Sequence, residues 1–138
     1  MGKKKNRGKS QKPRPCGGCR VCCHTLEIGA LNKPKWNNCQ HACLAGCGIY
    51  SQRPQECSDF QCLWSTRELP SNMRPDVVGM MAYYVDSQWG RAVLLVETKP
   101  GSFQVNPKAK SAVESHALRL GAPIIIAPKG EQPQVMLP

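Results

Sequence analysis

Apolar residues in the second half of the chain gather in short runs that are typical of strands. Two of these runs cover residues 77–85 and 92–97, and residues 86–90 between them form a connection of hairpin length that ends in Gly90. Hairpin turns often contain glycine, because glycine adopts positive φ angles without a steric penalty. The pattern therefore predicts two paired strands.

The apolar spacing becomes helical after residue 106. Asn106 is a favoured capping residue, and Pro107 suits the first helical position, where the backbone N–H has no partner in any case. Gly121 supplies the stop signal. The apolar positions between these signals repeat at spacings of three, four and seven: Ala109, Ala112, Val113, His116, Ala117 and Leu120. We expect a helix here, with His116 as a core residue rather than a ligand.

A second hairpin is predicted from residues 123–127 and 134–137, which flank Lys129-Gly130. The order of elements is then β-β-α-β-β, an α+β fold in which a small antiparallel sheet packs with one helix. These elements contain no Gly-rich phosphate loop and no nucleophile elbow. Residues 67–138 thus indicate a packed module in which no catalysis is evident and no small-molecule substrate is identified.

The composition changes at about residue 66. All nine cysteines lie between Cys16 and Cys62, in a stretch with few aliphatic residues. We call residues 16–66 the cysteine segment and residues 67–138 the C-terminal module. A chain of 138 residues suits one domain with a tail, so we expect the two parts to pack together as one domain.

Disulfide bonds are the ordinary alternative to metal binding in a cysteine-rich chain. Nine is an odd number, and the basic residues 1–15 lack the apolar stretch of an export signal. The longest apolar stretch, residues 77–85, is too short to span a bilayer. Thiols stay reduced in the cytosol, where close cysteine spacings favour metal or redox roles. The sequence therefore predicts a cytoplasmic metal-binding protein, and the leaning is towards no enzymatic activity.

The net charge of +10 is concentrated in residues 1–15, which hold seven basic residues and no acid. So polar a segment buries too little apolar surface to order itself, and we expect a disordered tail. Residues 3–14 would make weak electrostatic contact with RNA, the ribosome or an anionic surface. The alternative is a solubilising extension that binds nothing.

The cysteine spacings suit tetrahedral zinc sites. Cys16 and Cys19 have the two-residue separation from which a tight turn brings two thiolates to one ion. The adjacent Cys22 and Cys23 point apart, so they would serve two metals unless one bridges a pair. Three more cysteines recur every four residues, as on a short helix, and two close the set: Cys39, Cys43, Cys47, Cys57 and Cys62. Eight thiolates fill two zinc sites and leave one cysteine spare.

Other metal chemistries remain open at this point. Cys16, Cys19 and Cys22 reproduce the run of bacterial iron–sulfur ferredoxins, although the fourth cysteine and proline of that run are missing. Metallothionein-like storage is the third alternative, against which aromatic residues interleaved with the cysteines favour a packed site. His24 and His41 are candidates to replace a thiolate, and His41 is the better one.

The cysteines belong to one ordered motif, which reads Cys16-x2-Cys19-x2-Cys22-Cys23, then Cys39-x-His41, then Cys47-Gly-Ile-Tyr-x2-Arg-Pro-x2-Cys57-x2-Phe-x-Cys62-x-Trp. This motif resembles that of the bacterial YkgJ-like CxxCxxCC cysteine-cluster family. That family is described as a zinc- or iron-chelating domain of unknown biological role. The resemblance runs from residue 16 to about 127 and includes Arg74-Pro75-Asp76. It implies eight ligands, Cys16, Cys19, Cys22, Cys23, Cys39, Cys47, Cys57 and Cys62, and Cys43 remains a ninth candidate.

Arg53, within the motif, has two interpretations. It is either a donor that neutralises thiolate charge and tunes the metal, or a turn residue that binds nearby carbonyls. For the whole chain we expect a metal-binding protein with two thiolate sites, more typically zinc than iron–sulfur. Some larger relatives, the flagellin lysine N-methylases, carry a similar cluster, but nothing in this chain resembles a methyl-donor site. An iron–sulfur redox or modification-enzyme accessory role is the first alternative, because Cys-x2-Cys motifs support redox chemistry. Association with nucleic acid or the ribosome through the tail is the second.

Overall fold

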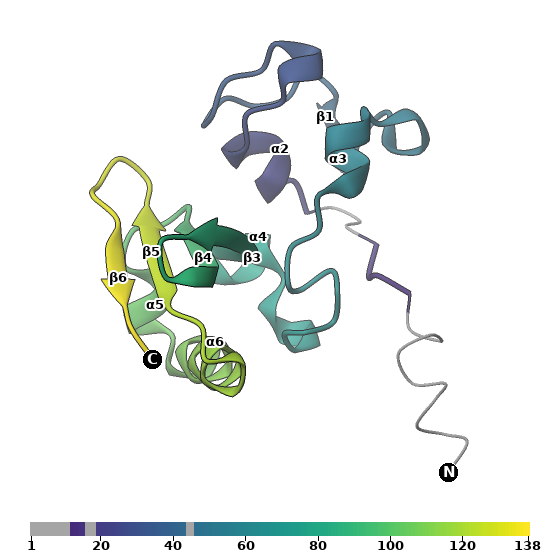
Figure 1. Cartoon of the computed structure of the whole chain (residues 1–138). Helices are drawn as coiled ribbons and strands as arrows, with labels where there is room; N and C mark the ends of the chain where they lie inside the picture. The colour runs from purple at the N-terminus through teal and green to yellow at the C-terminus, as the bar shows by residue number, and fades with distance from the viewer. Residues whose placement is uncertain (1–11, 16–18, 44–45) are drawn as a thin grey trace.

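Four strands form the sheet of the C-terminal module (Figure 1). They are β3 (Met80–Ser87), β4 (Gly90–Glu97), β5 (Ile124–Pro128) and β6 (Gln134–Met136), in the order β3-β4-β5-β6. The computed structural model describes residues 12–15, 19–43 and 46–138, and all structural statements concern these residues. The α+β class predicted from the sequence is confirmed.

The sheet is mixed, and the prediction of an antiparallel sheet was wrong for one pair. β3 and β4 form the expected antiparallel hairpin, and β5 and β6 pair in the same sense. β4 and β5, however, are parallel. The helix between them carries the chain back along the sheet before β5 begins, which is the connection that parallel neighbours require.

The first strand begins at Met80, three residues later than predicted, because a short helix precedes it. This helix, α4 (Pro75–Val78), has proline at its first turn and Asp76 near its positive end. Gly79 then reverses the chain with φ 77°, a left-handed conformation that favours glycine. The apolar character of Val77 and Val78 had suggested strand because apolar runs this short do not distinguish the two structures.

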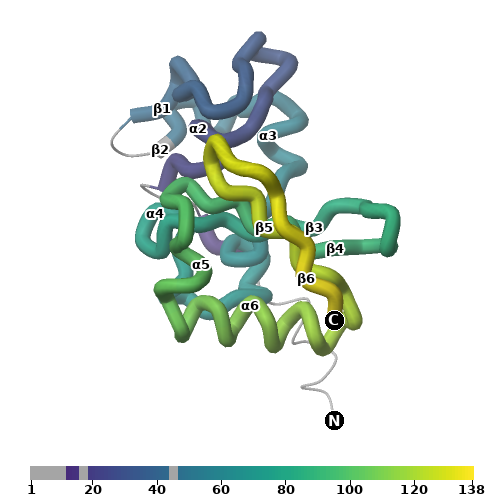
Figure 2. The backbone as a smooth tube through the Cα atoms, turned by 90° about the vertical axis from the view of Figure 1, so that its left-hand side faces the viewer, coloured from purple at the N-terminus to yellow at the C-terminus, as the bar shows by residue number. Residues whose placement is uncertain are grey.

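The predicted helix is present as α6 (Pro107–Leu120). The Asn106 side chain accepts a hydrogen bond from the backbone N–H of Ala109 at 3.1 Å, and Gly121 ends the helix with φ 63°. His116 is buried on the inner face, as predicted. A short helix that the sequence did not reveal, α5 (Ser102–Val105), precedes α6. Figures 1 and 2 place α6 at the end of the molecule opposite the cysteine segment.

The cysteine segment consists of short elements joined by turns. Its helices are α2 (Val21–Thr25) and α3 (Gln55–Asp59), and its strands β1 (Ala42–Cys43) and β2 (Gly46–Cys47) form a small hairpin. Turns of 3₁₀ helix lie at η1 (Gly29–Leu31), η2 (Tyr50–Gln52) and, in the C-terminal module, η3 (Ser71–Met73). No helix within the described ranges is both long and apolar enough to cross a bilayer.

One hydrophobic core connects the two parts of the chain. Leu63 and Trp64 from the end of the cysteine segment belong to the same buried cluster as Met81 of β3 and Val113 of α6. The backbone N–H of Leu63 also donates to the carbonyl of Ala82 at 2.7 Å. The compositional change at residue 66 therefore does not separate two cores.

The last residues of the expected tail contact this body. The Arg14 guanidinium donates to the carbonyls of Trp64 at 2.6 Å and Leu69 at 2.8 Å, and its backbone N–H donates to the Ser65 carbonyl at 2.7 Å. Arg67 in turn donates to the Lys12 carbonyl at 2.7 Å. Residues 12–15 are thus attached, whereas most of the predicted RNA-contacting residues, 3–11, lie outside the described residues.

Candidate metal-binding site

Six of the predicted ligands line one cavity of about 260 Å³ in the cysteine segment. They are Cys19, Cys22, Cys23, Cys39, Cys47 and Cys57. Most of the remaining wall is apolar and includes Leu26, Ile28, Ile49 and Phe60, with Tyr83 reaching in from β3. We call this space the first cavity. A soft donor set in apolar surroundings fits metals that prefer thiolate, namely zinc and iron–sulfur clusters.

A second cavity of about 330 Å³ adjoins the first. Cys19, Cys22 and Cys57 line both spaces, and Cys62 lines the second alone. The described part of its wall includes the basic side chains of Lys12, Arg14 and Arg53 but no acidic one. Three thiols therefore lie between the two cavities, and basic side chains line the second.

Helix α2 carries two of these cysteines, and a third precedes it. Cys19 is buried just before its first turn, and Cys22 and Cys23 lie within it. We had expected the adjacent pair to point apart, but a hydrogen bond from the Cys22 thiol to Cys23 lowers the pKa of Cys23 to about 7. Lys33 acts in the same direction. Only Cys22 of the adjacent pair reaches the second cavity, which agrees with the idea that the two serve different sites.

The four-residue spacing of Cys39, Cys43 and Cys47 does not mark a helix, as the sequence had suggested. Cys43 and Cys47 lie on the paired strands β1 and β2, where Cys47 is opposite Ala42 and Cys43 is opposite Gly46. Alternate pairs of a hairpin point to opposite faces, so the two cysteines diverge. Cys47 lines the first cavity, whereas Cys43 is exposed and lines neither.

Backbone amides lie close to two of the thiols. The N–H of His41 donates to Sγ of Cys39 at 3.4 Å. Burial raises the pKa of Cys62, and backbone hydrogen bonds from Ser65 and Trp64 partly offset this effect. Such bonds favour the thiolate, which is the form that binds metal.

Neither candidate histidine lines a cavity. His24 Nδ1 lies 2.9 Å from the Asn38 side chain, and its Nε2 lies 3.4 Å from Nζ of Lys129 on the β5–β6 loop. His41 Nε2 lies 3.3 Å from the amide nitrogen of Gln40. Cys16, the first residue of the motif, lies outside the described residues.

Arg53 binds a nearby carbonyl, as its interpretation as a turn residue predicts, and it also lies beside the thiols. Its Nε donates to the carbonyl of Tyr50 at 2.9 Å, and its guanidinium carbon lies 3.9 Å from the centre of the Tyr50 ring. It also lines both cavities, and its charge helps to lower the pKa of Cys23. The residue thus fixes its turn while it places a positive charge beside the thiols.

Two polar residues near the thiols were not among the predicted site residues. Asp76 of α4 lies within hydrogen-bonding reach of Cys19 and forms a double contact with Arg74, whose guanidinium lowers the pKa of the Asp76 carboxyl. Lys33 is buried and bonds to the carbonyl of Leu26, a residue that lines the first cavity. The Arg-Pro-Asp sequence gave a signal for Asp76, but a lysine in a polar loop gives no signal of burial.

The described residues contain no group of three or more histidine, cysteine or acidic side chains already gathered around one point. The thiols share cavity walls without converging. Comparison with known proteins found no matching family model, no matching curated protein and no matching solved structure.

Proposed function

We propose that this protein is a non-catalytic, cytoplasmic metal-binding protein whose cysteine segment holds two zinc ions, each with four thiolates. The observation that carries the proposal is that seven of the nine cysteines line two adjoining cavities, and that three of the seven line both. Two tetrahedral thiolate sites require eight ligands. Cys16 is the eighth, from its place in the motif and the family resemblance.

The neighbourhoods of the thiols suggest how they divide. Burial raises the pKa of Cys57, and the next contributions come from Cys23 and Cys39, with Cys47 also acting in this direction. Each of these three thiolates would therefore repel a thiolate at Cys57, and a cation bound among them would relieve that repulsion. We assign Cys23, Cys39, Cys47 and Cys57 to the first site.

The second site takes the cysteines nearest the C-terminal module. Cys62 lies in the second cavity alone, and its neighbour Cys19 contributes to the rise of its pKa. Cys22 reaches the same cavity. With Cys16 from the same motif, these complete a set of four. Sites with four thiolates are closed to further ligands, which suits a structural rather than a catalytic role.

An iron–sulfur cluster in an electron-transfer or modification accessory protein is the second candidate. Two observations favour it: the ferredoxin-like run of Cys16, Cys19 and Cys22, and the largely apolar wall of the first cavity. Thiolate ligation in a dry, apolar cavity suits clusters as well as zinc. The donor set alone does not distinguish the two.

Metal analysis of protein purified without oxygen tests the proposal. We expect about two zinc ions per chain and no visible absorbance. Iron with acid-labile sulfide and a brown colour would replace zinc by a cluster, and no bound metal would overturn the proposal. The division is tested by Cys39→Ser and Cys62→Ser, each of which should lose one zinc. Cys43→Ser is the matched control and should lose none.

A further inference from the structure

Lys33 is a buried lysine, with 6% of its surface exposed. It pairs with Ile28 in an isolated bridge that closes the loop around η1. Its ammonium group points inward and donates to three backbone carbonyls, those of Leu26, Pro34 at 3.0 Å and His24 at 3.4 Å. These bonds satisfy the three N–H donors of the ammonium but leave its charge uncompensated.

Lys33 lies next to the first cavity, because it donates to the carbonyl of Leu26 and pairs with Ile28, and both of these residues line that cavity. Among the described residues, Lys33 forms no ion pair with a carboxylate. Burial lowers the pKa of Lys33, and the opposing contributions come from Cys39, Cys23, Cys22 and Cys57. Three of these four belong to the first site as assigned above. Lysine is rarely buried without a partner, because leaving water costs the ammonium several kcal/mol.

The proposed first site carries a buried negative charge, whereas Lys33 carries a buried positive one. Four thiolates around a divalent cation carry a net charge of about −2, and the cavity wall around them is mostly apolar, with one basic residue, Arg53, and two acidic ones, Glu27 and Glu56. A positive charge fixed nearby lowers the free energy of that anionic centre, and the anionic centre lowers the cost of burying the lysine. Lys33 and the first site thus each lower the free-energy cost of burying the other's charge.

We infer that Lys33 is the internal counter-cation of the first thiolate site, a positioning residue that strengthens the binding of divalent metal without contacting it. This inference rests on the proposed function. It goes further by assigning the neutralising role, which the sequence suggested for Arg53, to a lysine outside the cysteine motif.

Three variants separate charge from packing. Lys33→Gln keeps an amide donor for the carbonyls but removes the charge, and Lys33→Arg keeps the charge. Lys35→Gln is the matched control, because it removes the same charge from an exposed position two residues away. Zinc affinity of the full chain is measured by competition with a chelating dye. We expect a loss of about 10–100-fold for Lys33→Gln, near-native affinity for Lys33→Arg and no change for Lys35→Gln.

A second measurement covers the case in which arginine does not fit the buried position. The affinity of Lys33→Gln for trivalent indium is compared with its affinity for zinc. A trivalent ion leaves the four thiolates with a charge of only about −1, so loss of a counter-cation should weaken zinc binding more than indium binding. Loss of packing alone should weaken both equally.

The outcomes are distinct. Native zinc affinity in Lys33→Gln, or equal losses for zinc and indium, would overturn the role of Lys33 while leaving the proposed function intact. If the wild-type chain takes up no zinc, the proposed function fails and this inference fails with it. A selective loss of zinc affinity in Lys33→Gln, with Lys35→Gln unaffected, supports the inference.

Discussion

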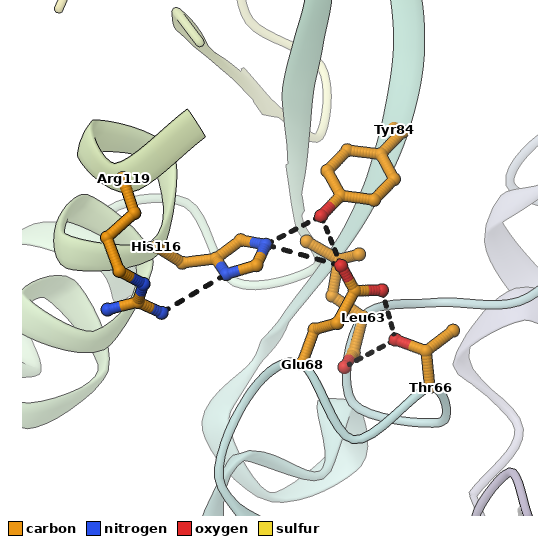
Figure 3. A network of polar contacts seen from close by, with 6 residues as sticks. All are labelled: Leu63, Thr66, Glu68, Tyr84, His116 and Arg119. Atoms are coloured by element: carbon orange, nitrogen blue, oxygen red, sulfur yellow. Dashed lines mark hydrogen bonds and ion pairs between the residues drawn. The ribbon is translucent and has the colours of Figure 1, made fainter. Parts of the chain in front are cut away.

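The hydroxyl of Tyr84 on β3 lies 2.6 Å from Nε2 of His116 on α6, and this contact belongs to a chain of polar groups that joins three elements (Figure 3). The same hydroxyl donates to Oε2 of Glu68, and Nη2 of Arg119 lies 3.4 Å from Nδ1 of His116. Thr66 donates to the other oxygen of Glu68 at 2.7 Å. This network of polar contacts connects the loop after the cysteine segment to the sheet and to α6.

The directions of these bonds assign the histidine tautomer. Because the only proton of the Tyr84 hydroxyl goes to Glu68, the hydroxyl must accept from Nε2–H of His116. Nδ1 is then the acceptor that faces Arg119. Burial lowers the pKa of His116, Glu68 opposes that effect and Arg119 adds to it. The folded protein therefore favours neutral His116.

Stability should fall in mild acid because of His116. A histidine whose pKa is lowered by folding binds protons more readily when unfolded, so the free energy of unfolding decreases as pH falls below the unfolded pKa of about 6.5. Urea denaturation in reductant and chelator, at several pH values between about 7.5 and 5.5, measures this dependence. His116→Gln keeps a donor for Tyr84 and should flatten the curve.

The control for this experiment is His24→Gln, which should keep the wild-type pH dependence. His24 is half-buried, contacts the Asn38 side chain and Lys129, and lies outside the Tyr84–His116 contact. If His116→Gln and the wild type lose stability in parallel, other groups govern the acid response.

Glu97 should be intolerant of its amide analogue. Its side chain is 2% exposed, and its two oxygens accept from the backbone N–H groups of Gly101 at 3.0 Å and Phe103 at 2.8 Å. In Glu97→Gln one oxygen becomes an NH₂ donor that faces a donor. We expect the free energy of unfolding to fall by about 2–3 kcal/mol, measured by chemical denaturation. The exposed Glu131→Gln should change it little, and an equal loss there would contradict this account.

The elements that local signals define were predictable from the sequence, and those that distant contacts define were not. The ends of α6 were predictable from Asn106, Pro107 and Gly121, because helix capping depends on residues close in the sequence. The parallel pairing of β4 and β5 depends on the path of the helix between them, which no short pattern records. Short apolar runs such as Val77-Val78 lacked a period long enough to distinguish helix from strand.

The same distinction applies to the candidate site. The cysteine motif identified the residues of the cavity walls, but the exposure of Cys43 follows from the pairing of β1 with β2. The burial of Lys33 depends on carbonyls that the folded loop brings together. Spacing therefore indicates which residues bind, while their electrostatic surroundings require the fold.

Arg14 should contribute to stability although it lies in the basic tail. Its guanidinium supplies the donors for the carbonyls of Trp64 and Leu69 and lies 5.4 Å from the centre of the Trp64 ring. Arg14→Ala leaves both partly buried carbonyls without this donor. We expect a loss of about 1–3 kcal/mol in the free energy of unfolding. The exposed Lys12→Ala removes the same charge and should cost far less, so equal losses would argue for a general charge effect.

Removal of metal should unfold only part of the cysteine segment. Structural zinc contributes roughly 10–16 kcal/mol of apparent binding free energy per site, and residues 20–59 bury few side chains that would replace it. Leu63, in contrast, belongs to the common core and bonds to the Ala82 carbonyl. We therefore place the limit of metal dependence near residue 61 rather than at residue 66, where the composition changes.

Hydrogen exchange read segment by segment, before and after chelation, measures that limit. The backbone bonds from Cys39 to Cys23 and from Gly48 to His41 should lose protection, while the amides of Leu63 and of β3 stay protected. Replacing Cys16 and Cys19 together by serine should act in the same direction, and Cys43→Ser should have no effect. Loss of protection along the whole chain would mean that the common core itself depends on metal. Continued protection of the Cys39 and Gly48 amides would mean that the cavity walls form before metal binds. The metal would then bind to a preformed fold rather than stabilise it.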